Sequence, residues 1–265
     1  VYSDTEIKCD SPSVLNGMGI NEKNITQYDV EITLNDNDLN GPAQVFYYYK
    51  DTFTTSLDPI FGPRAGNTTV NVTGLDFTQP GACNVTLRVA TYHIKPDIIE
   101  KGWMTFKTPQ VNFTGATVVQ IALNGRQFDK DIKVQNRDKE NTFYYYKKPL
   151  VRNLSPRKGP TIGGTELTLF GIGFDDTFFE INKIEDRKIY YKFVDVDDQS
   201  IQYGDIYSTI VYDSHMINVV TPRVYREGTK AFIYLSYNKN DENFRNSNEK
   251  LYFTYYLLPN ITGLN

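Results

Sequence analysis

Several residue types are scarce in this chain, and each scarcity excludes a class of protein. Only two of the 265 residues are cysteine, Cys9 and Cys83, which are too few for a disulfide-rich scaffold and too far apart for a zinc site. The two histidines, His93 and His215, lie near no nucleophile motif, so we expect no enzyme. No run approaches the roughly 18 consecutive apolar residues that cross a bilayer, so we expect no membrane span in this segment.

Positive charge is also in short supply. The chain has 28 Lys and Arg against 32 Asp and Glu, for a formal net charge of −4. Nucleic-acid binding relies on basic surfaces, so we expect no nucleic-acid partner. Residues 36–41 begin like a calcium loop, but the position that needs a bidentate carboxylate is Tyr47, and residues 195–198 are typical of a solvated acidic loop. We therefore expect no metal and no cofactor.

Aromatic residues, in contrast, are abundant, with 20 Tyr and 16 Phe. Such side chains favour strands. Polar and apolar residues alternate with a period of two over residues 69–73, 83–89 and 166–169, which predicts strands with one buried face. Only residues 95–101 resemble a helical turn. Several short strands per hundred residues are typical of an immunoglobulin-like sandwich, so the predicted fold class is all-β.

An internal repeat divides the chain into units. Phe46-Tyr47-Tyr48-Tyr49-Lys50 recurs 97 residues later (143 − 46) as Phe143-Tyr144-Tyr145-Tyr146-Lys147, and the glycine-rich segment 62–77 recurs at the same offset as 159–174. Phe253-Thr254-Tyr255-Tyr256 is a weaker third copy. We predict the C-terminal part of one unit (1–50), two complete units (51–147 and 148–257) and the first strand of a following unit (258–265).

The repeated segment resembles a known family. Residues 159–174, Gly-Pro-Thr-Ile-Gly-Gly-Thr-Glu-Leu-Thr-Leu-Phe-Gly-Ile-Gly-Phe, follow Leu154-Ser155-Pro156 and look like the opening of an IPT/TIG domain. This is the immunoglobulin-like fold shared by plexins and some transcription factors. The resemblance implies tandem β-sandwiches arranged end to end. The middle copy has Asn67 where the family usually has a second glycine, and Asn is among the non-glycine residues that best tolerate a positive φ.

Acceptor patterns for N-linked glycans are more frequent than the composition predicts, since chance gives about three. The alternation places Asn71 and Asn84 on the polar phase of their strands, where a side chain points outward. Pro156 is expected to hinder modification of Asn153. N-linked glycans imply passage through a secretory pathway, so we expect an extracellular or cell-surface location. The seven acceptors are Asn24, Asn67, Asn71, Asn84, Asn112, Asn153 and Asn260.

The residues leave three states open for the cysteines. Cys83 lies on the apolar phase of its expected strand and fits a small buried hydrophobe. A bridge between Cys9 and Cys83 would join adjacent units. Cys9 would otherwise pair with a residue upstream of Val1.

Repetition without an active-site motif predicts a non-enzymatic structural protein. Gly62 follows Lys50 by only 12 positions, and Gly159 follows Lys147 by the same number. Pro59 and Pro149 restrict the backbone in these short junctions, so we expect a semi-rigid array. The expected assembly is a homo-oligomer or homopolymer, namely a filament, fibril or stalk formed by head-to-tail domain contacts. The candidate donor strand for such contacts is Leu258, Pro259, Asn260 and Ile261.

An alternative function is an ectodomain segment of an adhesion molecule or plexin-like receptor that binds a protein partner. A non-repeated binding domain or a membrane span outside this segment would favour this alternative.

Overall fold

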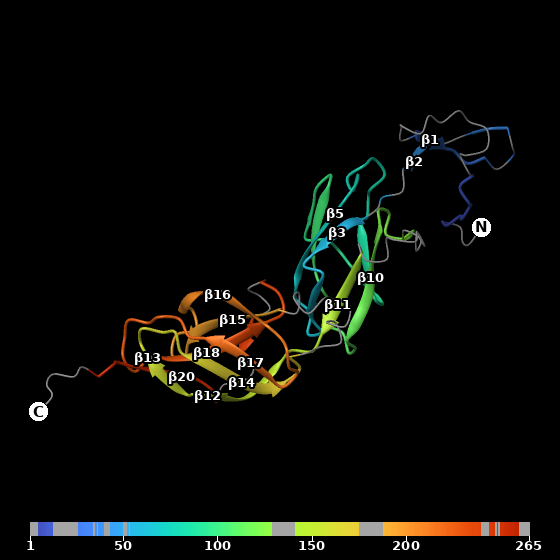
Figure 1. Ribbon diagram of the computed structural model, residues 1–265. Coiled ribbons are helices and arrows are strands. Elements are labelled where there is room, and N and C mark those ends of the chain that lie inside the picture. Colours follow the sequence, from blue (N-terminus) through green and yellow to red (C-terminus); the bar gives the residue numbers. More distant parts are fainter. Residues whose placement is uncertain are drawn as a thin grey trace, which may run out of the picture.

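Strands account for all the regular structure in the described part of the chain. The computed structural model describes residues 5–12, 26–33, 35, 37–39, 43–49, 52, 54–128, 141–174, 188–239, 244–246, 248 and 250–259. These residues form twenty strands and no helix. The strands fall into three groups along an elongated chain, with β1 and β2 at one end and β13 and β20 at the other (Figure 1). We call them the partial unit (described residues before 50), the middle unit (54–146) and the C-terminal unit (150–256).

The partial unit contains one antiparallel pair, β1 (Thr26–Val30) with β2 (Gln44–Tyr48). The middle unit has two sheets. One has the order β3 (Thr54–Asp58), β5 (Thr69–Gly74), β9 (Trp103–Lys107) and β8 (Ile98–Ile99). The other has the order β4 (Phe61–Pro63), β11 (Thr142–Tyr146), β10 (Gly115–Ala122), β6 (Thr86–Val89) and β7 (Tyr92–Ile94).

The C-terminal unit repeats this plan. Its smaller sheet has the order β12 (Leu150–Ser155), β14 (Glu166–Ile172) and β17 (Met216–Val220). Its larger sheet has the order β13 (Lys158–Pro160), β20 (Phe253–Tyr256), β18 (Lys230–Ser236), β15 (Lys188–Asp195) and β16 (Gln202–Ile210), and β19 (Arg245–Asn246) also pairs with β18. In both units a short strand, β4 or β13, runs parallel to the closing aromatic strand.

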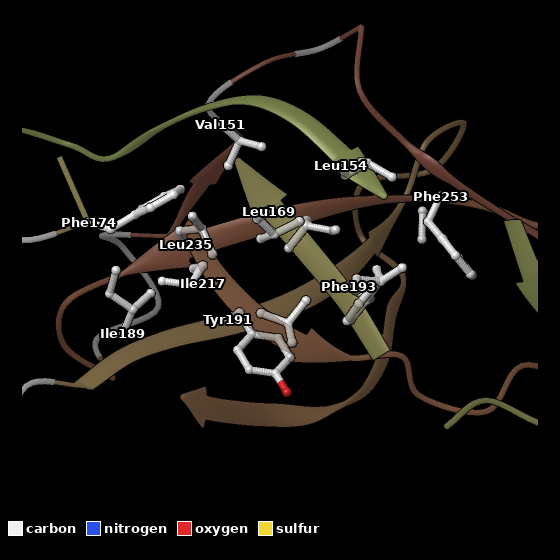
Figure 2. Packing of buried hydrophobic residues seen from close by; sticks show 14 of the residues in the cluster. Val151, Leu154, Leu169, Phe174, Ile189, Tyr191, Phe193, Ile217, Leu235 and Phe253 are labelled. Atoms are coloured by element: carbon white, nitrogen blue, oxygen red, sulfur yellow. The ribbon is translucent and has the colours of Figure 1, made fainter. Parts of the chain in front are cut away.

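Alternating burial produces one core in each complete unit. Along β5 the valines at 70 and 72 are buried while Asn71 and Thr73 face solvent, as the period-two pattern predicts. In the C-terminal unit, inward side chains from both sheets meet in the same way (Figure 2). The closing strands supply large aromatic side chains to the cores, including the fully buried Phe143 and Phe253.

The glycine-rich turns confirm that the repeat is structural. Gly66 and Gly163 have φ values of 74° and 80°, and the residues after them, Asn67 and Gly164, have values of 64° and 77°. Asn67 therefore adopts the left-handed conformation that the sequence predicts for it. The amides of Asn67 and Gly164 donate to equivalent threonine carbonyls, those of Thr108 and Thr221, at 2.8 and 2.9 Å.

Two local expectations from the sequence are wrong. The predicted helical turn at 95–101 contains β8, whose two isoleucines pair with β9. The strand predicted from Cys83 onward begins at Thr86, so Cys83 and Asn84 precede it in a turn-rich segment. Cys83 is consequently exposed and is not the buried hydrophobe that the alternation indicated. Alternation was misleading here because the backbone before Thr86 is not extended in a sheet.

Candidate functional site at the junction between units

The junction between the middle and C-terminal units is built around Tyr146. This tyrosine ends β11, which belongs to the sheet of the middle unit, yet its side chain is 1% exposed and is part of the core of the C-terminal unit. Its ring lies 4.7 Å from that of Tyr237 at an interplanar angle of 78°, an edge-to-face geometry that aromatic pairs prefer. The last residue of one sheet therefore fills the core of the next unit.

Phe61 makes a second connection from the same side. Its ring packs against the C-terminal core and lies 6.4 Å from the ring of Tyr146. Its backbone carbonyl accepts a hydrogen bond from Asn238 Nδ2 at 2.8 Å. Asn238 is buried, its backbone amide donates to Ser236 Oγ at 3.2 Å, and Ser236 Oγ donates to Asn238 Oδ1 at 3.3 Å, which orients the side chain. The junction thus combines apolar packing with a directional hydrogen bond.

Tyr237 is held in turn by its own unit. Its side chain is buried, and its hydroxyl donates to the carbonyl of Gly173, which holds the ring in place. Because Tyr237 is fixed, the ring of Tyr146 meets a rigid partner. A contact of this kind restricts the angle between neighbouring units.

The junction between the partial and middle units also involves a closing aromatic strand, but the space between the two units is less completely packed. Tyr49, which is equivalent to Tyr146, packs against the core of the middle unit. The segment Ile121–Asn124 corresponds to Leu235–Asn238, so Leu123 stands where the C-terminal unit has Tyr237. A groove of about 940 Å³ lies here between the aromatic strand β2 and residues that include Gln79, Leu123 and Asn124. A leucine is smaller than a tyrosine, which agrees with the open space.

The predicted glycan acceptors differ in their surroundings. Asn67, Asn71, Asn112 and Asn153 are exposed, and the side-chain oxygen of Asn153 accepts a hydrogen bond from Arg157 at 2.8 Å. Asn24 and Asn260 lie outside the described residues.

Asn84 is exposed, but its side chain is engaged. Its Oδ1 accepts from Lys95 Nζ, which also donates to Thr86 Oγ1 at 3.0 Å. A Cβ on Gly125 would lie 2.4 Å from Asn84 Nδ2, so the glycine leaves room for the Asn84 side chain. Asn84 is thus exposed, with its amide oxygen bonded to Lys95, and its modification stays a prediction.

The remaining predicted site residues are not gathered into one site. Cys9 and Cys83 are both exposed free thiols. Leu258 and Pro259 of the candidate donor strand are exposed, while Asn260 and Ile261 lie outside the described residues. Sequence reasoning did not identify Tyr146, Phe61 and Asn238 as functional, although the recurrence of the aromatic string was a signal for Tyr146.

The acidic cluster around Asp195 is a turn. Burial acts to raise the pKa of Asp195, but hydrogen bonds from Tyr203 and from the amides of Asp198 and Asp197 outweigh it and lower the pKa. Burial and the same contact with Asp195 raise the pKa of Tyr203 to about 12. Within the described residues, no group of three or more His, Cys, Asp or Glu side chains is placed to hold a metal ion.

One cluster has the composition of a catalytic triad. Ser214 Oγ lies 2.7 Å from His215 Nδ1, and Asp213 Oδ1 lies 3.8 Å from the same nitrogen. In a catalytic triad the carboxylate bonds one ring nitrogen of the histidine and orients it, while the other ring nitrogen takes the proton of the nucleophile. Here Ser214 and Asp213 both approach Nδ1, so the arrangement is not that of a triad. It is an exposed turn.

Comparisons with known proteins show what the C-terminal unit is similar to. Residues 149–253 match the IPT/TIG domain. Among solved structures, the chain is similar to the plexin A4 extracellular region, at 16% identity and a TM-score of 0.46, over 81% of this chain and 17% of that one. It is also similar to the fibronectin(III)-like modules of Clostridium thermocellum CbhA, at 11% identity and a TM-score of 0.31, over 81% of this chain and all of that one.

The plexin A4 chain is much longer, and this chain spans about a sixth of its length. No curated protein matches the chain. Within the described residues, no helix has the length and apolarity to cross a membrane.

The middle unit repeats the glycine turn, strand order and parallel closing pair of the C-terminal unit. Residues 149–253 thus match the IPT/TIG domain, and the described middle and C-terminal units share one all-β, immunoglobulin-like fold.

Proposed function

We propose that this chain is part of a non-enzymatic, glycosylated, extracellular or cell-surface array of IPT/TIG domains that acts as a semi-rigid structural element. The array assembles head to tail into a filament, fibril or stalk. The observation that carries the proposal is the insertion of Tyr146 into the core of the following unit. In an array of units joined by flexible linkers, such a side chain would stay within its own unit.

Glycosylation is supported by the exposure of several acceptors. Asn71 lies on the outer face of β5, and Asn67 and Asn112 are also exposed, so a bulky glycan at any of them leaves the cores intact. The test is glycopeptide mass spectrometry of the chain secreted by eukaryotic cells. We expect a glycan on Asn71 that disappears in the variant Asn71→Gln. Secreted material with unmodified Asn67, Asn71 and Asn112 would contradict the proposal.

Assembly is tested separately on the native protein. We expect electron microscopy to show rods that lengthen with concentration, and light scattering to show a matching rise in mass. Alanine at Leu258 should shorten the rods if the candidate donor strand makes the contact. Monomers at every concentration would refute head-to-tail assembly while leaving the semi-rigid array in place.

One observation favours the alternative of an adhesion or receptor ectodomain. On the outer face of the smaller C-terminal sheet, Phe170 and Met216 are register partners and both are exposed, and Val220 is exposed on the same face of β17. Exposed apolar side chains grouped on a sheet face are typical of protein-binding surfaces. A single protein partner whose binding is abolished by Phe170→Ala, in a chain that stays monomeric, would establish this alternative.

A further inference from the structure

The end of the C-terminal unit that faces away from the middle unit carries a group of exposed apolar side chains, which we call the distal patch. Backbone hydrogen bonds join the three segments that contribute to it. The amide of Thr161 donates to the carbonyl of Tyr256 at 2.8 Å, and the amide of Val224 donates to the carbonyl of Thr161 at 2.8 Å. The patch consists of Ile162, Tyr225, Tyr256, Leu257 and Leu258, with exposed fractions of 61, 90, 41, 56 and 57%.

Tyr256 occupies the position that Tyr146 has in the middle unit. Tyr146 pairs with Pro63 in the parallel closing pair, and Tyr256 pairs with Pro160, which is the repeat equivalent of Pro63. The two tyrosine carbonyls also accept hydrogen bonds from equivalent amides, those of Arg64 and Thr161, both at 2.8 Å. Tyr146 and Tyr256 therefore leave their sheets in the same way.

The three closing tyrosines differ in what covers them. Tyr49 packs against the core of the middle unit, and Tyr146 is enclosed in the core of the C-terminal unit. Tyr256 is 41% exposed, against 1% for Tyr146. At both places where a unit follows, the closing tyrosine contacts that unit's core. This regularity identifies what would cover Tyr256.

We propose that the distal patch is the docking surface for a further unit of the same kind, which follows Pro259 in the sequence and receives Tyr256 into its core. The spacing fits, because Pro149 and Pro259 each stand three residues after their tyrosine. The inference rests on the proposed semi-rigid array, and it replaces a contact between molecules through Leu258, because one surface cannot hold both occupants. It adds that this junction is more apolar than the one before it, since Leu257 and Leu258 stand where the middle unit has Lys147 and Lys148.

The experiment adds a following unit. A second copy of residues 150–257 is joined directly after Pro259, and tyrosines are nitrated with tetranitromethane and mapped by peptide mass spectrometry. The peptide across the new junction is unique, so Tyr256 of the first copy is measured alone. We expect its nitration to slow by about tenfold or more relative to the unextended chain, because a buried side chain reacts only during local opening. Tyr212, which is 81% exposed and outside the patch, is the control and should not change.

A second fusion separates docking from folding of the added copy. Here a flexible Gly/Ser linker of about ten residues stands between Pro259 and the copy, which leaves the copy free to fold without being positioned. Protection of Tyr256 in the direct fusion and its loss in the linked one supports the inference. Equal, rapid nitration in both fusions overturns it, as does concentration-dependent protection of Tyr256 in the unextended chain, which would identify a second molecule as the occupant.

The nitration of Tyr146 in the same samples distinguishes the two proposals. If Tyr146 stays protected while Tyr256 reacts freely in both fusions, only the distal docking is refuted. If Tyr146 also reacts rapidly, the semi-rigid array itself fails.

Discussion

Replacing Tyr146 by alanine tests the junction most directly. The side chain ends a strand of the middle unit but is 1% exposed in the core of the C-terminal unit. Truncating a fully buried large aromatic residue costs about 3–5 kcal/mol. Tyr146→Ala should therefore destabilise the C-terminal unit by roughly 3 kcal/mol, a factor of about 100 in its unfolding equilibrium. The middle unit keeps its core and should lose much less.

The chain contains its own probe for separating the two units. Trp103 is the single tryptophan and lies in β9 of the middle unit, so its fluorescence reports that unit alone. Far-UV circular dichroism follows the strands of both units. In urea titrations of Tyr146→Ala we expect the dichroism transition to move to lower urea and the Trp103 transition to stay close to that of the parent chain.

Two further variants sharpen this test. Tyr256→Ala removes the equivalent tyrosine at an exposed position and should change stability by no more than about 0.5 kcal/mol. A double-mutant cycle with Tyr237→Ala should give a coupling of about 0.5–1.5 kcal/mol for the ring pair. Zero coupling, or a Trp103 transition that shifts as far as the dichroism transition, would refute the assignment of Tyr146 to the C-terminal core.

Three other predictions concern the units themselves. Gly62→Ala and Gly159→Ala should each destabilise their own unit by about 1–3 kcal/mol, because the added Cβ would lie 2.4 and 2.3 Å from the hydroxyls of Thr68 and Thr165. The urea transition of Trp103 fluorescence should shift for Gly62→Ala only. Asn67→Ala should cost about 1 kcal/mol at a φ of 64°, whereas Asn67→Gly should be nearly neutral; equal urea midpoints for both would contradict this conformational account. Asp195→Asn should weaken the loss of stability at acid pH. The pKa of Asp195 is lower in the folded state than its unfolded value near 3.9, so its carboxylate stabilises the fold above that pH and the stabilisation is lost as the pH falls below it. The same dependence of the urea midpoint on pH in variant and parent, between about pH 5 and pH 2, would contradict this prediction.

Much of each unit was predictable because the determining signals are local. The glycine turn needs a positive φ at Gly66 and Asn67, and alternation along β5 decides which side chains enter the core. The 97-residue repeat then transfers these features to the C-terminal unit. The same local reasoning failed around Cys83, where a polar-apolar alternation continued into a segment that is not a strand.

The sequence by itself determined the all-β class, the repeat and the turns, because these depend on the conformational preferences of neighbouring residues. Only the tertiary structure decided which core each aromatic side chain enters. Tyr145 and Tyr146 are adjacent and chemically identical, yet one is buried in the middle unit and the other in the next. That difference arises from packing between residues distant in the chain, such as Tyr146 with Tyr237 and Phe61 with Asn238, which no local pattern encodes.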